Sequence, residues 1–269
     1  MRAIPETLDP SAVAGIDRLL DTLEQEEGAR ILLAVESGSR AWGFPSPDSD
    51  YDCRFIYVRE ADRYLSLWPP RDVIESPGDV LDVSGWDLGK ALKLMLKGNA
   101  VAIEWLTSPI VYRGDAAFRQ GMLALAARHV SRVPVMRHYL HLGERQFRTY
   151  LTDPAGVPLK KLFYVLRPAA ALRWLMRHPD RTVAPMHFPT LMAECDPPEE
   201  IVSLVAGLLA RKARTRELGT APLPAPIAAF VADAFERARD FCDGSACLRT
   251  GNTAKAEADA FFRAAVLRP

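Results

Sequence analysis

Two aspartates separated by one residue, Asp50 and Asp52, are the side chains of this sequence whose type and spacing best suit chemistry. They stand where a loop rich in Pro and Ser passes into an apolar run, residues 53–58. Side chains alternate across a strand, so residues two apart point to the same face. Two carboxylates on one face repel each other unless a cation lies between them, and oxygen-only ligands suit Mg²⁺ or Mn²⁺. The pair therefore predicts a divalent metal site, the alternative being a turn capped by its own Asp side chains.

A Gly-Ser turn precedes the two aspartates. Gly38-Ser39 follows the apolar run 31–35, and ten residues separate Ser39 from Asp50. Glycine lets the backbone approach a ligand closely, and the backbone N–H groups and hydroxyl of such a turn can bind an anion. Arg40 would either neutralise phosphate charge or form an exposed salt bridge. The turn and the carboxylates together predict a site for a metal-bound polyphosphate.

The spacing from Gly38-Ser39 to Asp50-x-Asp52 resembles the signature of the DNA polymerase β-like nucleotidyltransferase superfamily. The longer string at residues 36–44, with Ser-Asp-Tyr-Asp at 49–52, resembles more closely a family of bacterial and phage predicted nucleotidyltransferases, the YcgL-like family. The resemblance extends to residues 83–88, 104–106 and 164–168, and Cys53 departs from it by replacing an aliphatic residue. It implies an α/β nucleotidyltransferase fold, Mg²⁺ or Mn²⁺ as cofactor, and transfer of NMP from an NTP to a hydroxyl with release of pyrophosphate.

The resemblance also implies a third carboxylate, because members of the superfamily supply one from a neighbouring strand between apolar residues. Leu81-Asp82-Val83 has that form. We expect Asp50 and Asp52 to hold two metal ions and Asp82 to complete the site of the ion that activates the attacking hydroxyl. Asp87 is the competing candidate, although an acid in the first turn of the following helix would stabilise that helix.

A second group of candidate nucleotide-binding residues lies in the helical half. Lys160, Tyr164 and Arg167 fall at i, i+4 and i+7, so they share one helix face. Such a face would suit triphosphate and base contacts, and helical domains of the superfamily often supply such groups. The alternative is an ordinary solvated helix face.

The elements that must position these residues follow from hydrophobic periodicity. We predict an α/β (α+β) domain with a small mixed sheet over residues 1–114, holding strands near 30–36 and 52–59 and a hairpin over 72–84. An all-α domain follows over residues 115–269. Helical spacing with prolines at the joints predicts its helices at 115–129, 133–151, 157–178, 197–217, 224–241 and 252–266.

Charge is distributed unevenly in a chain of 269 residues whose net charge is zero. Residues 1–115 hold 12 Lys and Arg against 20 Asp and Glu, a net of −8, and residues 116–269 hold 22 against 14, a net of +8. An acidic half suits metals and a basic half suits phosphates, although the two halves would also attract each other. Scattered cysteines and the lack of an export signal or of a long apolar run predict a cytoplasmic protein with no membrane partner.

The acceptor of the transferred nucleotide is not fixed by any motif. The basic half and the family analogy favour an RNA or tRNA end. A protein acceptor, as in toxin–antitoxin enzymes, or a small molecule, as in antibiotic modification, is the alternative. A non-catalytic module that senses nucleotides is a hypothesis of a different class.

Overall fold

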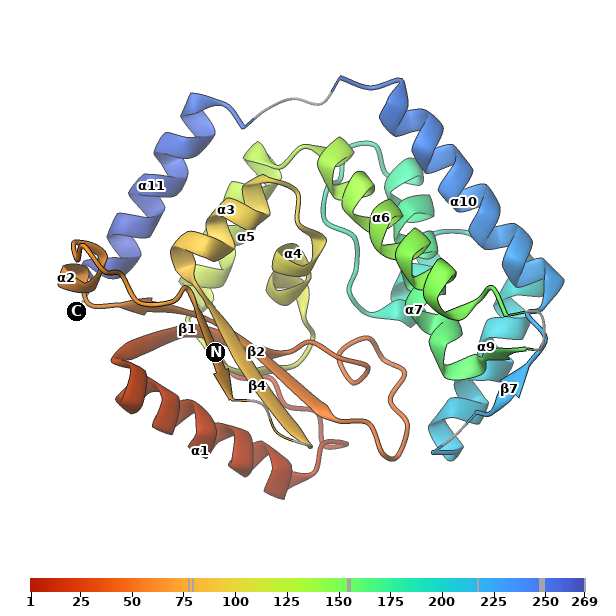
Figure 1. Cartoon of the computed structure of the whole chain (residues 1–269), viewed down its shortest axis with the longest axis horizontal. Coiled ribbons are helices and arrows are strands. Elements are labelled where there is room, and N and C mark those ends of the chain that lie inside the picture. Colours follow the sequence, from red (N-terminus) through yellow and green to blue (C-terminus); the bar gives the residue numbers. More distant parts are fainter. Residues whose placement is uncertain (77, 79, 154–155, 217, 247–249, 269) are drawn as a thin grey trace. The chain divides into compact units, whose positions relative to one another are not determined.

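The computed structural model describes residues 1–76, 78, 80–153, 156–216, 218–246 and 250–268 (Figure 1). The chain folds into two compact units. The sheet unit comprises Met1–Ala41, Asp50–Val130 and Arg249–Pro269, and the helical unit comprises Trp42–Ser49 and Ser131–Leu248. The first is a mixed sheet with helices and the second is largely helical, as the sequence predicts.

The sheet unit is built on five strands in the order β3-β4-β2-β1-β5. β2 and β4 run parallel, and the other neighbouring pairs are antiparallel. The antiparallel pair β3–β4 confirms the predicted hairpin, although Pro77 of its turn lies outside the described residues. The strands are β1 (Ala29–Glu36), β2 (Tyr51–Arg59), β3 (Val73–Ser76), β4 (Leu81–Asp87) and β5 (Val111–Gly114).

Helices cover both faces of this sheet (Figure 1). α1 (Pro10–Glu27) packs on one face, where Ile16 and Leu20 share a core with Phe55 and Tyr57 of β2. Because strand side chains alternate, Asp52 and Arg54 point to the other face. The remaining helices of the unit are α2 (Ala61–Tyr64), α3 (Leu88–Leu96), α4 (Ala100–Thr107), α5 (Ala116–His129) and α11 (Asn252–Val266).

The helical unit is organised around α7 (Leu159–Arg177), which packs against α6 (Arg132–Tyr150) and α10 (Ala225–Asp243). α8 (Phe188–Glu194) and α9 (Glu199–Arg214) complete its helices. The unit also contains a two-stranded ladder, β6 (Val157–Pro158) with β7 (Thr220–Ala221). The region is largely helical, as predicted, and the ladder is too short for a period-2 pattern to reveal.

α5 and α11 follow residue 114 in the sequence but belong to the sheet unit. The Phe261 ring of α11 lies 5.7 Å from that of Phe118 on α5, and a Cβ on Gly121 would come within 2.5 Å of the Phe261 ring. The C-terminal helix therefore returns to the sheet, and the division into functional domains at residue 114 stays a prediction. Of the helices described, none is long and apolar enough to cross a membrane.

Candidate active site

A pair of carboxylates on adjacent parallel strands forms the centre of the candidate site. Asp52 of β2 lies opposite Asp82 of β4 in the strand register. Arg54 Nη2 donates to Asp82 Oδ2 at 2.6 Å and to Asp52 Oδ1 at 3.4 Å. The Asp52 and Asp82 side chains are 31% and 39% exposed, so a ligand from solvent can reach both. Arg54 lies on the same face of β2 as Asp52, and its guanidinium holds the two accessible carboxylates in place.

Burial and neighbouring charges change the pKa of Asp52. Partial burial is the main cause that raises the pKa of Asp52, and the negative charges of Asp82 and Asp50 raise it further against the opposing effect of Arg54. Asp50 itself is exposed and precedes the first residue of β2. Its backbone oxygen accepts from Arg40 Nε at 3.2 Å, while the Arg40 guanidinium lies 3.9 Å from the centre of the Tyr51 ring.

The Gly38 turn is fitted against the Asp52 carboxylate. β1 ends at Glu36, and the Ser37 N–H donates to the Asp52 backbone oxygen at 2.9 Å. A Cβ built on Gly38 would lie 1.7 Å from Asp52 Oδ2. A side chain at this position would therefore force the turn or the carboxylate to move. Ser39 follows in the turn and is half-buried.

Glu36 is a functional candidate that the sequence interpretation missed. Its side chain is fully buried, and Oε1 accepts the backbone N–H groups of Asp52 at 3.0 Å and Gly38 at 3.4 Å. The Tyr112 hydroxyl donates to Oε2 at 2.5 Å. One carboxylate thus ties together the turn, the start of β2 and β5. The only sequence signal is a charged residue directly after the apolar run 31–35, which many exposed strand ends share.

We predict that Glu36→Ala lowers the free energy of unfolding by about 3–4 kcal/mol, because the N–H groups of Asp52 and Gly38 and the Tyr112 hydroxyl lose their buried acceptor. Tyr112→Phe should cost about 1–2 kcal/mol. Urea unfolding measures both. A Glu36→Ala protein as stable as wild type would contradict this role.

Glu36→Gln removes the titratable group at this position, so its stability can be compared with that of wild type as the pH changes. Burial raises the pKa of the Glu36 carboxyl above its ordinary value of 4.5. The folded state then holds the proton to higher pH than the unfolded chain does, so the contribution of Glu36 to stability is lost as the pH rises through the raised pKa. Relative to wild type, Glu36→Gln should become more stable as the pH increases above 4.5. The reverse trend in unfolding free energy would contradict the direction of the shift.

Asp87, the rival of Asp82, has a different environment. It is the N-cap of α3, where Oδ1 accepts the Gly89 N–H at 2.7 Å. Its Oδ2 accepts the Tyr64 hydroxyl at 2.6 Å, and the residue is buried. Burial and this hydrogen bond raise the pKa of Tyr64. Asp87 is thus engaged in capping, whereas Asp82 lies beside Asp52.

Lys160, Tyr164 and Arg167 lie in the helical unit with the segment 42–49. The Lys160 Nζ is 3.5 Å from Asp48 Oδ2, and the Arg167 guanidinium lies 4.2 Å from the centre of the Trp42 ring. Arg167 is buried rather than solvated, and Tyr164 is an exposed neighbour whose ring meets Trp42 edge-on at 5.9 Å. The three side chains therefore surround a common loop instead of forming one solvated face.

Lys212 is a buried cation of the helical unit. It belongs to a basic run at the end of α9 that is typical of solvated helix ends. The side chain is buried, and Nζ donates to the Phe44 backbone oxygen at 2.6 Å. Burial, aided by the charge of Lys160, lowers the pKa of Lys212 to about 8. Lys212 thus fixes the segment 42–49 within the helical unit.

The donor chemistry of the carboxylate pair fits a hard divalent cation. Asp52 and Asp82 offer accessible oxygens, and Arg54 neutralises part of their mutual repulsion. A divalent cation bound by the same oxygens would relieve the rest. Within the described ranges, no three His, Cys, Asp or Glu side chains converge as a metal site, so the grouping of Asp50 with this pair stays a prediction. The residues therefore fit a metal held by two carboxylates, with Asp50 as an expected further ligand.

Comparisons with known proteins identify the family of this chain. Residues 14–264 match the family model described as "RlaP: RNA repair pathway DNA polymerase beta family". The chain is also similar to the uncharacterized protein YcgL of Bacillus subtilis strain 168. The two are 44% identical over 205 residues, which cover 75% of this chain and 78% of the relative.

Proposed function

This chain belongs to the RNA repair pathway DNA polymerase β family, and from that premise we propose that it is a metal-dependent nucleotidyltransferase that acts on RNA. The observation that carries the proposal is the registered pair Asp52 and Asp82, braced by Arg54 and backed by the Gly38 turn. Accessible carboxylates on neighbouring strands beside a Gly-Ser turn are suited to a metal–triphosphate ligand.

The proposed reaction is attack of an acceptor hydroxyl on the α-phosphate of an NTP. A bond forms between the acceptor oxygen and the α-phosphorus, and the bond from the α-phosphorus to the bridging oxygen of the β-phosphate breaks. Pyrophosphate leaves, and the hydroxyl proton passes to solvent water. Asp50, Asp52 and Asp82 would hold Mg²⁺ or Mn²⁺, which when bound supplies charge neutralisation for entering and leaving oxygens. Gly38 and Ser39 would orient the triphosphate, so most of the catalysis comes from positioning and electrostatics.

Arg40, Lys160, Tyr164 and Arg167 are the proposed remaining nucleotide contacts. What supports them is their charge and aromatic character, together with the ordered contacts of Arg40 with Tyr51 and of Arg167 with Trp42. Planar guanidinium groups held by an aromatic ring are suited to phosphate recognition.

The proposal is tested by incubating the protein with each NTP, labelled at the α-phosphate, with Mg²⁺ or Mn²⁺ and a total cell extract. The RNA, protein and small-molecule fractions are then counted. We expect label in RNA, lost in the Asp50→Ala/Asp52→Ala double variant. Label in the protein or small-molecule fraction would contradict RNA as acceptor. Label that persists in the double variant would refute the site, and NTP binding without any labelling would favour a nucleotide sensor.

Asp82 and Asp87 should give opposite results when each is replaced. Asp82→Asn should reduce transfer roughly 10²–10³-fold with little loss of stability. Asp87→Ala should cost about 2 kcal/mol of unfolding free energy, from the lost cap and the unpaired Tyr64 hydroxyl. Its transfer rate per folded molecule should stay within about threefold of wild type. Rate assays at matched folded concentration and urea unfolding measure both effects. If instead Asp87→Ala lost transfer activity and Asp82→Asn kept it, Asp87 would be the third carboxylate.

A further inference from the structure

An apolar loop with almost fully exposed side chains follows α2. Leu65, Leu67 and Trp68 are 86%, 90% and 88% exposed. The loop is ordered by a turn in which the Trp68 N–H donates to Ser66 Oγ at 3.1 Å. Single apolar residues on a surface need no explanation, but three large ones within four positions form a patch typical of an interaction site. We call residues 65–68 the Trp68 loop.

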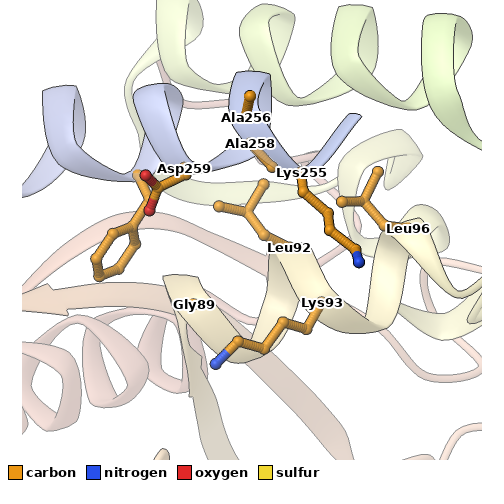
Figure 2. A pocket seen from close by; sticks show the side chains of 9 residues that line it. Gly89, Leu92, Lys93, Leu96, Lys255, Ala256, Ala258 and Asp259 are labelled. Atoms are coloured by element: carbon orange, nitrogen blue, oxygen red, sulfur yellow. The ribbon is translucent and has the colours of Figure 1, made fainter. Parts of the chain in front are cut away.

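A cavity of about 660 Å³ opens between α3 and α11 (Figure 2). The Tyr64 ring, directly before the loop, meets the Phe262 ring edge-on at 5.0 Å, and Phe262 lines the cavity. Small side chains on α11 leave the space unfilled. The lining residues are Gly89, Leu92, Lys93, Leu96, Lys255, Ala256, Ala258, Asp259 and Phe262.

The charges of the cavity and of the loop are complementary. Asp259 forms an ion pair with Arg263, one turn further along α11. Lys93 and Lys255 form no ion pair within the part of the chain that the structure describes, so the cavity carries positive charge. Glu60 and Asp62, just before the Trp68 loop, are exposed carboxylates, and with the exposed Arg63 the segment keeps a net negative charge.

We propose that two copies of this chain associate through this surface, the Trp68 loop of each copy entering the α3–α11 cavity of the other. In a two-fold dimer, residue i of one copy contacts residue j of the other, and residue j of the first contacts residue i of the second. Each copy must therefore carry both the loop and the cavity on the same surface. The sheet unit meets this requirement. Trp68 and Leu67 supply the apolar surface that the cavity accepts, and Glu60 and Asp62 approach Lys93 and Lys255. Buried aromatic residues of this kind dominate binding at interfaces.

Sedimentation velocity between about 1 and 100 µM protein tests the proposal without any catalytic readout. Wild type should be a dimer. Trp68→Ala removes the inserted side chain, and Ala256→Trp fills the cavity from an exposed position on α11. Each should weaken the dimer by at least about 30-fold. Val202→Ala, at another exposed apolar residue, is the control that should dimerise like wild type.

An equimolar mixture of Trp68→Ala and Ala256→Trp separates this geometry from other dimers. Each homodimer lacks both loop–cavity contacts, but the mixed pair regains one, from the intact loop of one variant to the intact cavity of the other. We expect heterodimers at concentrations where each variant alone is monomeric. A wild type that is monomeric throughout, a dimer indifferent to both substitutions, or no recovery on mixing would overturn the proposal. So would monomeric wild type that binds phosphatidylglycerol vesicles through Trp68, which would make the loop a lipid contact.

Discussion

Asp52→Asn should reduce nucleotide transfer by on the order of 10³-fold while raising the melting temperature. The loss of activity corresponds to about 4 kcal/mol of transition-state stabilisation. It is expected because an amide supplies one neutral oxygen where the proposed reaction needs a charged metal ligand. Transfer of labelled nucleotide at saturating NTP, with Mg²⁺ and with Mn²⁺, measures this effect.

The gain in stability follows from the environment of Asp52 in the fold. Burial and the charges of Asp82 and Asp50 raise its pKa. The folded state therefore holds a proton on Asp52 more tightly than the unfolded chain does, and the stability that this protonation contributes is lost as the pH rises through the raised pKa. At neutral pH the charged form is disfavoured by folding, so a neutral isostere should raise the melting temperature by about 1–3 °C. A less stable Asp52→Asn protein that keeps its activity would show that the carboxylate is structural.

Gly38→Ala should abolish most of the transfer activity, because the added methyl group collides with the Asp52 carboxylate. Its Cβ would stand 1.7 Å from Asp52 Oδ2, so either the turn or the carboxylate must move. A displacement of about 1 Å at a reacting centre can cost on the order of 10²-fold in rate, and the strain should also cost about 1–3 kcal/mol of stability. Metal affinity measured by calorimetry should fall with the rate, because the affected side chain is the proposed metal ligand.

Gly207→Ala is the matched control for this substitution. Gly207 lies in α9, and a Cβ there would meet nothing within 4 Å. Alanine is the better helix former by up to about 1 kcal/mol, so this variant should be as stable as wild type or more so, with unchanged transfer. Equal effects of the two substitutions, or full activity of Gly38→Ala, would remove the argument for a close fit between turn and carboxylate.

The local elements of this protein are determined by its sequence. The apolar runs give β1 and β2, the period of 3.6 residues gives α5, α6, α7, α9, α10 and α11 near their predicted positions, and the Pro-rich stretches separate them. These predictions succeed because strands and helices depend on patterns within a few residues. The placement of Asp52 after a Gly-Ser turn is also a local feature, although the catalytic roles of these residues stay predictions.

Which side chains of the candidate site meet is decided by contacts between segments far apart in the sequence. Asp82 lies opposite Asp52 only because β4 pairs with β2 in parallel and in this register, and no pattern within either strand states that register. Arg54 reaches both carboxylates for the same reason. The tertiary fold likewise buries Glu36 under Tyr112, 76 residues away, converting an ordinary strand-end acid into the acceptor that joins turn and strand.

The helices show the same division between local pattern and packing. Periodicity places α11 at the end of the chain, but only packing returns it to the sheet unit, where its small residues leave the cavity beside α3. Lys212 and Arg167 belong to segments whose composition is typical of solvated helix faces, yet each is buried against Phe44 or Trp42. Burial of a charged side chain depends on which distant segment covers it. The sequence therefore determined the elements and their chemistry, and the tertiary structure decided which side chains meet.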